Sequence, residues 1–279
     1  MRNDPLSAID IDQLAAVLRN AALAEIMPRF RRLAGGDIRQ KTSAIDLVTE
    51  ADEAAERFIT AECARLWPHA NFVGEEGVAA DERTLASVGT ADLSIVVDPI
   101  DGTANFASGA PLFAVMAAVV SKGETVAGII YDPLGDDFVI AEKGSGTFLK
   151  RADGEAIRQT MAAPVAVSEM VGMASSSSLP TAEKRELLSR LAAVKVIGNF
   201  RCAGHEYRLA GTGHLHFNLY HKLMPWDHLG GALIIEEAGG HVRRLDGSAY
   251  LPSHVEGGLL CATDPDSWHA LCETIYPKA

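Results

Sequence analysis

Long apolar runs are absent from this chain of 279 residues: the longest, residues 112–120, is about half as long as a membrane-spanning helix. A surplus of basic residues is absent too, because 37 Asp and Glu outnumber 25 Lys and Arg and leave a formal net charge of −12. Binding to nucleic acid or to an anionic membrane normally needs a Lys/Arg footprint, so we expect neither as a partner. The polar N-terminal residues 1–5 also lack the apolar core of a signal peptide.

Cysteine is scarce, and its spacing fits neither a metal site nor a disulfide framework. The chain has four cysteines, with no CxxC pair and no metal-like spacing to histidine: Cys63, Cys202, Cys261 and Cys272. We interpret them as free thiols of a reducing compartment. Together with the polar N-terminus, this predicts a cytoplasmic protein.

The composition is that of a globular protein, with 48% hydrophobic and 22% charged residues. Apolar periodicity and a capping box, Thr49-Glu50-Ala51-Asp52, predict helices over residues 11–26, 49–67, 181–193, 204–211, 226–238 and 266–275. Short β-branched or apolar runs predict strands over residues 71–73, 93–97, 113–120, 126–131, 138–141, 170–174, 194–197, 215–220, 242–244 and 258–261. Helices before, between and after runs of strands favour an α+β protein with layered sheets and helices. The pattern breaks over residues 151–164, where we predict the boundary between an N-terminal subdomain, residues 1–150, and a C-terminal subdomain, residues 151–279.

The most informative segment is the string VVDPIDGTANF, residues 96–106. An apolar strand ends there in two carboxylates three residues apart, Asp98 and Asp101. Gly102 permits a close backbone approach or an unusual φ, and a helix that begins at Thr103 would present free N–H groups as an anion site. Such a turn can hold a divalent cation and a phosphate side by side. The alternative, an Asx-type turn with a helix cap, explains one aspartate but not both.

Two further acidic clusters support a cation site. Glu75 and Glu76 follow the strand at 71–73 between two glycines, a pattern that alone is also typical of a solvated loop. Asp227 lies at the start of the helix at 226–238, where favourable contact with the helix dipole could alone explain it. Hard oxygen ligands suited to Mg²⁺ are nevertheless available as a set, and no His or Cys accompanies them at zinc spacing: Glu75, Asp98, Asp101 and Asp227.

The order of these motifs resembles that of the inositol monophosphatase family. The family's order is matched by GEE at 74–76, by DPIDGTxNF at 98–106, and by the segment from WD at 226–227 to EAGG at 237–240. Lys41 and DLVT at 46–49 are similar to its upstream segment, so the resemblance extends over residues 8–275. It implies a layered α-β-α-β-α sandwich of the sugar-phosphatase type, a homodimer and inhibition by lithium.

The resemblance also implies two to three Mg²⁺ ions. Glu75, Asp98 and the carbonyl of Ile100 would hold one ion. Asp98, Asp101 and Asp227 would hold a second, with Asp98 bridging the two. Glu75 and water would hold a third, looser ion. Most of the implied ligands thus belong to the N-terminal subdomain, and Asp227 to the C-terminal one.

Catalytic roles follow from the same resemblance. Thr103, paired with Asp46 and helped by Glu75, would orient and activate the attacking water. The backbone N–H groups of Gly102 and Thr103 would receive phosphate oxygens, and Asp227 would face the substrate. In-line attack would release the alcohol and phosphate without a covalent intermediate.

Substrate recognition is where this chain departs from the family. Arg201 begins the expected Arg-x-x-Gly motif, but His205 and Glu206 follow it in place of small residues. The glutamate that commonly touches substrate hydroxyls is here Tyr220. We therefore expect His205 and Glu206 to face the pocket, with an exposed helix start as the alternative. The serines at 175–178 stand where the family often has Gly-Ser-Ser, or they form a polar loop.

These observations predict a magnesium-dependent phosphatase that acts on a small phosphorylated metabolite, such as an inositol monophosphate or a sugar phosphate. Histidinol phosphate, fructose 1,6-bisphosphate and 3′-phosphonucleotides are alternative substrates. A non-catalytic protein that binds a metal or a phosphosugar is a different class, although the retained Lys41, Asp46 and Thr103 favour an enzyme. A two-carboxylate glycosidase would give no reason for the Gly-Thr anion site.

Overall fold

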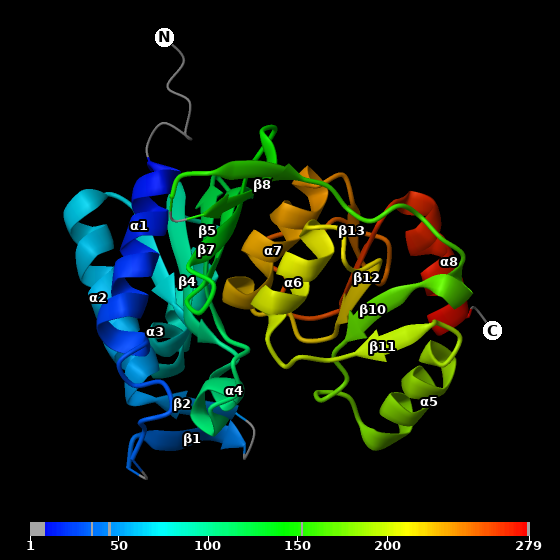
Figure 1. Cartoon of the computed structure of the whole chain (residues 1–279), viewed down its shortest axis with the longest axis horizontal. Coiled ribbons are helices and arrows are strands. Elements are labelled where there is room, and N and C mark those ends of the chain that lie inside the picture. Colours follow the sequence, from blue (N-terminus) through cyan, green and yellow to red (C-terminus); the bar gives the residue numbers. More distant parts are fainter. Residues whose placement is uncertain (1–8, 35, 44–45, 152, 278–279) are drawn as a thin grey trace.

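The computed structural model describes residues 9–34, 36–43, 46–151 and 153–277, and it leaves out the side chains of residues 41–46. Helical and sheet layers alternate through the molecule (Figure 1). Helices α1 (Ile11–Ala21) and α2 (Glu50–Leu66) cover one face of a seven-stranded sheet. Helices α6 (Ala203–Gly211) and α7 (Pro225–Glu237) lie between that sheet and a five-stranded one, whose far face is covered by α5 (Thr181–Leu191) and α8 (Pro265–Ile275). The predicted α-β-α-β-α sandwich is confirmed.

Strand pairing in the larger sheet is parallel between β3 and β4 and antiparallel elsewhere. Its order is β3 (Asn71–Gly74), β4 (Leu93–Asp101), β5 (Ala114–Ser121), β6 (Glu124–Asp132), β7 (Asp137–Glu142), β8 (Gly146–Arg151) and β9 (Ala156–Gln159). The smaller sheet has the order β11 (Val196–Gly198), β10 (Val171–Ala174), β12 (Phe217–Tyr220), β14 (Leu259–Ala262) and β13 (His241–Arg244). Shorter elements complete the chain: η2 (Ala22–Ile26), β1 (Ile38–Ser43), β2 (Asp46–Thr49), α3 (Glu75–Ala80), η3 (Glu82–Ser87), α4 (Thr103–Ser108) and η4 (Val167–Glu169).

The β8–β9 hairpin occupies the segment that sequence patterning had marked as a boundary. Most side chains of this hairpin are partly or fully exposed, so many of them are polar, and the sequence lacks the apolar run that predicts a strand. Pairing with β8 therefore extends the larger sheet to Gln159, and the smaller sheet begins at Val171. The division into two subdomains at residue 150 stays a prediction.

Helix α7 holds the two sheets together, and its glycines explain how closely it packs. Ten of its residues are buried, because it has a sheet on either side. A Cβ on Gly230 would lie 2.8 Å from the carbonyl oxygen of Ala117 in β5, and one on Gly231 would lie 2.2 Å from the ring of Tyr207 in α6. This glycine pair therefore permits the tight packing of α7 against β5 and α6. Within the described ranges, no helix has the length and apolar character needed to span a membrane.

Candidate active site

Strand β4 carries two acidic residues at its C-terminal end. Asp98 and Asp101 are buried, with 2% and 7% of their surfaces exposed. Side chains three residues apart point to opposite faces of a regular strand. The pairing of β4 with β5 is irregular between Asp98 and Asp101, and such an irregularity redirects side chains. Both carboxylates therefore reach the same cavity.

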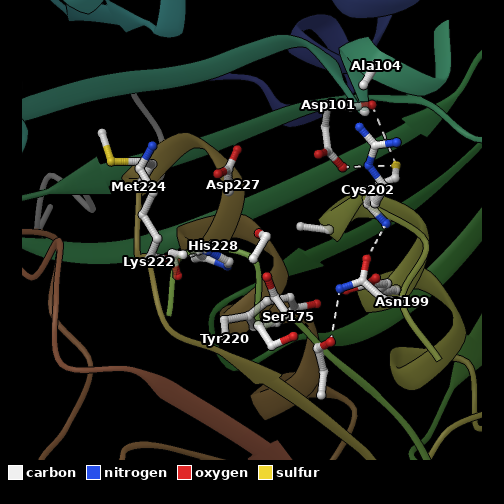
Figure 2. Close-up of a pocket in the computed structure, with 18 of the residues that line it drawn as sticks. Asp101, Ala104, Ser175, Asn199, Cys202, Tyr220, Lys222, Met224, Asp227 and His228 are labelled. Atoms are coloured by element: carbon white, nitrogen blue, oxygen red, sulfur yellow. Dashed lines mark hydrogen bonds between the residues drawn. The ribbon is translucent and has the colours of Figure 1, made fainter. Parts of the chain in front are cut away.

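Hydrogen bonds fix both carboxylates. Oδ1 of Asp98 accepts the N–H of Ile100 at 2.9 Å. Oδ2 of Asp101 accepts the N–H of Gly204 at 2.5 Å. The same oxygen accepts the thiol of Cys202 at 3.0 Å (Figure 2). A Cβ on Gly204 would lie 3.1 Å from that same oxygen, so a glycine at the start of α6 allows this approach.

The first turn of α7 brings the third carboxylate. Asp98, Asp101 and Asp227 each place a carboxylate oxygen within 4.8 Å of the other two. Three hard oxygen donors so close together fit a Mg²⁺-type cation and offer nothing to a soft metal.

Burial has a large electrostatic effect on this cluster. It raises the pKa of Asp98 and Asp227 well above the usual carboxyl range, and the neighbouring carboxylates raise both further. Burial also raises the pKa of Asp101 to about 6, although hydrogen bonds from Cys202 and Gly204 oppose it. Without a cation the cluster therefore retains protons, and a divalent ion would relieve the repulsion between its carboxylates.

Glu75 begins α3 directly after β3 and lines the same cavity. Burial is the main cause of the raised pKa of Asp98, and the charge of Glu75 is the next largest. Glu56 of α2 supports this turn: its carboxylate accepts the N–H groups of Glu76 at 2.8 Å and Gly77 at 2.7 Å. A Cβ on Gly74 would lie 2.3 Å from the carboxyl carbon of Glu56, so a glycine there leaves room for this contact.

Thr103 begins α4 and follows Gly102, whose φ of 88° is left-handed. The Thr103 hydroxyl lies 3.1 Å from Oδ1 of Asp52 and 3.0 Å from the carbonyl oxygen of Ile100. Asp52 is 1% exposed, and its Oδ2 accepts the N–H of Thr49 at 2.9 Å in the predicted capping box. Burial raises the pKa of Asp52 to about 7, against the hydrogen bond from the Thr49 hydroxyl.

Among the side chains that the structure describes, the carboxylate hydrogen-bonded to Thr103 belongs to Asp52, which sequence reasoning missed. We predicted Asp46 in this role, and the side chain of Asp46 lies outside the described part of the chain. The signal was present, because Asp52 is the fourth residue of the capping box. The helix cap accounts for an aspartate at this position, so the sequence alone does not indicate its second partner, Thr103.

A single cavity of about 720 Å³ brings the expected site residues together. The predicted metal ligands line it with Gly102, Thr103, Glu206 and the four serines 175–178. In Figure 2, Asp101 and Asp227 lie on the opposite side of this pocket from Ser175 and Tyr220. The carboxylate cluster, which is suited to a hard cation, thus lies at one end of a cavity large enough for a small metabolite.

The two residues expected to contact the substrate, His205 and Glu206, differ in whether they line the cavity. The ring Nε2 of His205 donates to the carbonyl oxygen of Phe113 at 3.1 Å, and His205 is not among the described residues that line the cavity. Glu206 does line it but is 2% exposed, and its Oε1 accepts the N–H of Phe200 at 2.7 Å. Burial raises the pKa of Glu206 to about 7. Tyr220 also lines the cavity, with its ring centroid 4.6 Å from that of His228.

Known proteins have sequences similar to this one. The family model described as the inositol monophosphatase family matches residues 9–277. A fructose-1,6-bisphosphatase/inositol-1-monophosphatase of Thermotoga maritima is 32% identical over 212 residues, which are 76% of each chain. Inositol monophosphatase 1 of Sus scrofa is 32% identical over 222 residues, 77% of this chain and 76% of the other.

Solved structures have the same fold as this chain. An IMPase of Thermotoga maritima superposes with a TM-score of 0.80 at 26% identity and covers 95% of this chain and 96% of its own. The extragenic suppressor protein suhB of Bartonella henselae superposes with a TM-score of 0.79 at 26% identity and covers 96% and 98%. Fold and site together define a phosphoric monoester hydrolase. The chain belongs to the inositol monophosphatase family.

Proposed function

We propose that this protein hydrolyses a small phosphate monoester with Mg²⁺ and water. The convergence of three buried or half-buried carboxylates within 4.8 Å carries the proposal. One ion would be held by Glu75, Asp98 and the carbonyl of Ile100, and a second by Asp98, Asp101 and Asp227. A third, looser ion would be held by Glu75 and water. Bound Mg²⁺ would lower the pKa of a water and stabilise the charge on the leaving oxygen.

Thr103 and Asp52 would position the attacking water. The Thr103 hydroxyl has one hydrogen, which it can donate to Asp52 or to the Ile100 carbonyl. The lone pairs of the Thr103 hydroxyl are then available to accept a hydrogen bond from a water in the cavity. Glu75 would help to receive the proton that this water loses when it attacks. We propose Asp52 for this carboxylate role beside the predicted Asp46, whose side chain lies outside the described part of the chain.

The turn at Gly102 would bind the phosphate. The first N–H groups of a helix have no intrahelical acceptor, and α4 begins immediately after Gly102. We propose that the N–H groups of Gly102 and Thr103 donate to phosphate oxygens, and that Asp227 faces the ester oxygen from the other side.

Replacement of Asp98 by Asn tests the proposal. Asn keeps the shape of the side chain but loses the charge that both cations would share, so phosphate release with millimolar Mg²⁺ should fall at least a hundredfold. Asp92→Asn, at an exposed aspartate just before β4, is the matched control and should retain wild-type activity. Wild-type turnover by Asp98→Asn would overturn the proposed function. Metal or phosphosugar binding without turnover in the wild type would favour the non-catalytic alternative.

The substrate within this class is the finer part of the proposal. We propose an inositol monophosphate-like or sugar phosphate ester, with Glu206 replacing the acid absent at Tyr220; His205 is a weaker candidate because its ring is held by Phe113. Histidinol phosphate, fructose 1,6-bisphosphate and 3′-phosphonucleotides remain alternatives. A phosphate-release screen over these esters with Mg²⁺ separates them.

Three further properties belong to the proposal through the family relationship: lithium sensitivity, a homodimer and a cytoplasmic location. Li⁺ would occupy the position between Asp98, Asp101 and Asp227 and delay phosphate release. Unchanged turnover in tens of millimolar LiCl would contradict lithium sensitivity without affecting the phosphatase proposal. The mass measured by light scattering tests the homodimer.

A further inference from the structure

We propose that Tyr207 and His228 form a hydrogen-bonded brace that positions the proposed metal ligand Asp227. The brace is the chain of contacts that runs from the Tyr207 hydroxyl through the His228 ring to the backbone carbonyl of Lys222. The inference rests on the proposed function, which assigns Asp227 to the second Mg²⁺ ion. It adds two positioning residues behind that ligand, and neither of them touches the ion or the substrate.

His228 is a buried polar residue in the first turn of α7, and both of its ring nitrogens are hydrogen-bonded. It is 3% exposed and directly follows Asp227. Its Nε2 lies 2.9 Å from the carbonyl oxygen of Lys222, and its Nδ1 lies 3.1 Å from the hydroxyl of Tyr207. His228 lines the cavity, but it cannot bind a substrate without breaking one of these two bonds. We therefore assign it a positioning role.

The Lys222 carbonyl determines which groups donate along the brace. A carbonyl oxygen can only accept a hydrogen bond, so Nε2 of His228 carries the hydrogen. Burial lowers the pKa of His228 to about 4, so the ring is neutral near pH 7 and its Nδ1 has a free lone pair. The Tyr207 hydroxyl therefore donates to Nδ1. Removal of this hydroxyl would leave a buried acceptor without its donor, which is costly.

The start of α7 has no side-chain cap, and the brace ties it to the preceding loop instead. The helix begins at Pro225, and its N-cap residue Met224 provides no side-chain hydrogen bond. His228 bonds to the carbonyl of Lys222, six residues before it, and so joins that loop to the first helical turn. In Figure 2, His228 and Lys222 lie on the same side of the pocket as Asp227. A shift of this turn would therefore move the Asp227 carboxylate.

Helix α6 thereby contacts two of the carboxylates that would hold the same ion, one directly and one through the brace. The N–H of Gly204, in its first turn, donates to Oδ2 of Asp101 at 2.5 Å. Tyr207 lies one turn further along α6, is 0% exposed and holds His228, the neighbour of Asp227. The separation of Asp101 from Asp227 therefore depends on α6. Mg²⁺ is sensitive to this separation because it demands near-ideal octahedral geometry.

Calorimetric titration of the substrate-free protein with Mg²⁺ and with Ca²⁺ tests the brace. His228→Leu removes both hydrogen bonds, and we expect it to raise the Kd for Mg²⁺ about tenfold, as loss of a residue that orients a metal ligand typically does. Ca²⁺ accepts a more flexible coordination, so its Kd should change less than about threefold. His228→Gln keeps an amide donor for the Lys222 carbonyl and should restore most of the affinity for Mg²⁺. Tyr207→Phe keeps the ring, should also weaken binding of Mg²⁺, and decides the case if His228→Leu does not fold.

Tyr131→Phe is the matched control for Tyr207→Phe. Tyr131 is also 0% exposed and donates to Asp136 at 2.8 Å, but it is not among the described residues that line the cavity. Its variant should leave the Kd for Mg²⁺ unchanged, whatever its effect on Tm. An unchanged Kd for Mg²⁺ in Tyr207→Phe would overturn the brace, as would an equal loss of affinity for Ca²⁺ or a His228→Gln variant no better than His228→Leu. If the wild type binds Mg²⁺ but hydrolyses no ester, the proposed function fails, and the same Kd values still decide the brace.

Discussion

Asp52 has two structural partners, one for each of its carboxylate oxygens. Oδ2 closes the capping box with Thr49 at the start of α2, and Oδ1 meets the hydroxyl of Thr103 at the start of α4. The start of a long helix thus fixes the position of a residue in the candidate active site. A side chain whose local role is fully explained can still have a second, tertiary role.

The variant Asp52→Asn should lose activity far in excess of its loss in stability. A positioned general base contributes about 10² to 10⁴ in rate, and we expect kcat to fall roughly a hundredfold because Asp52 acts through Thr103. Thr49→Ala is the control, since it removes the cap and should lower the free energy of unfolding by about 1 kcal/mol. Its kcat should change less than tenfold. Equal losses of kcat in both variants would show that Asp52 acts only as a helix cap.

Glu206 offers a second test at the scale of one residue. Glu206→Ala removes the acceptor for the N–H of Phe200 and the carboxylate in the cavity wall, so the preference for the natural ester over p-nitrophenyl phosphate should fall. A lost contact of this kind costs on the order of 1–3 kcal/mol, which is about a tenfold to hundredfold change in kcat/KM. Glu206→Gln separates the two roles, because it keeps an acceptor for Phe200. Equal losses on both esters would assign Glu206 to structure alone.

Helix α3 is too short to hold its own first residue firmly, and α2 supports it. The carboxylate of Glu56 takes the N–H groups of Glu76 and Gly77, next to the proposed ligand Glu75. Helix α2 thereby positions Glu75 through contacts to the backbone that follows it.

Removal of this support should weaken binding of Mg²⁺. Glu56→Ala leaves two N–H groups without that acceptor, and Gly74→Ala drives a methyl group into the Glu56 carboxylate. We expect both variants to raise the Kd for Mg²⁺ about tenfold by calorimetry, with kcat largely restored at saturating Mg²⁺. Glu62→Ala, at a surface pair with Arg65 on the same helix, is the control. A lower Tm with unchanged affinity for Mg²⁺ would give Glu56 a purely structural role.

The elements also explain how much of the site could be predicted from the sequence. Asp98, Asp101 and Thr103 were predictable because one continuous turn carries them, and local chemistry decides its shape. The approach of Asp227 to them depends on the packing of α7 against β5, which the glycine pair permits but does not specify. Contacts between distant segments are decided by packing, and patterning along the chain does not record them.

At the scale of the whole molecule, the site joins the two sheets. Its acidic cluster combines β4 of the larger sheet with α7, and α6 contributes the N–H that fixes Asp101. Charge repulsion in the cluster therefore acts on the packing between layers. A cation that relieves this repulsion would stabilise the whole fold, because it binds the folded state in preference to the unfolded one.

Stability without metal should consequently fall as pH rises. The pKa of Asp101 is about 6 and that of Asp52 about 7, with Asp98 and Asp227 also raised, whereas an unfolded aspartate has a pKa of about 3.9. Between about pH 4 and 7 the folded protein therefore binds more protons than the unfolded chain. The contribution of these groups to stability is complete below pH 4 and is lost as pH rises through their folded pKa values.

Thermal unfolding with and without Mg²⁺ tests this linkage. In EDTA, Tm should be lower at pH 8 than at pH 5.5, and Mg²⁺ should raise it more at pH 8, where fewer protons compete for the carboxylates. Asp98→Asn removes a buried charge, so it should raise the Tm of the metal-free protein at pH 8 by several degrees. A gain of 1 kcal/mol in stability corresponds to about 2–4 °C in Tm. The same variant should reduce the rise in Tm that Mg²⁺ produces. Asp92→Asn should do neither. A metal-free Asp98→Asn protein that melts below the wild type would mean that the Asp98 carboxylate stabilises the fold by itself, and the electrostatic account of the site would be wrong.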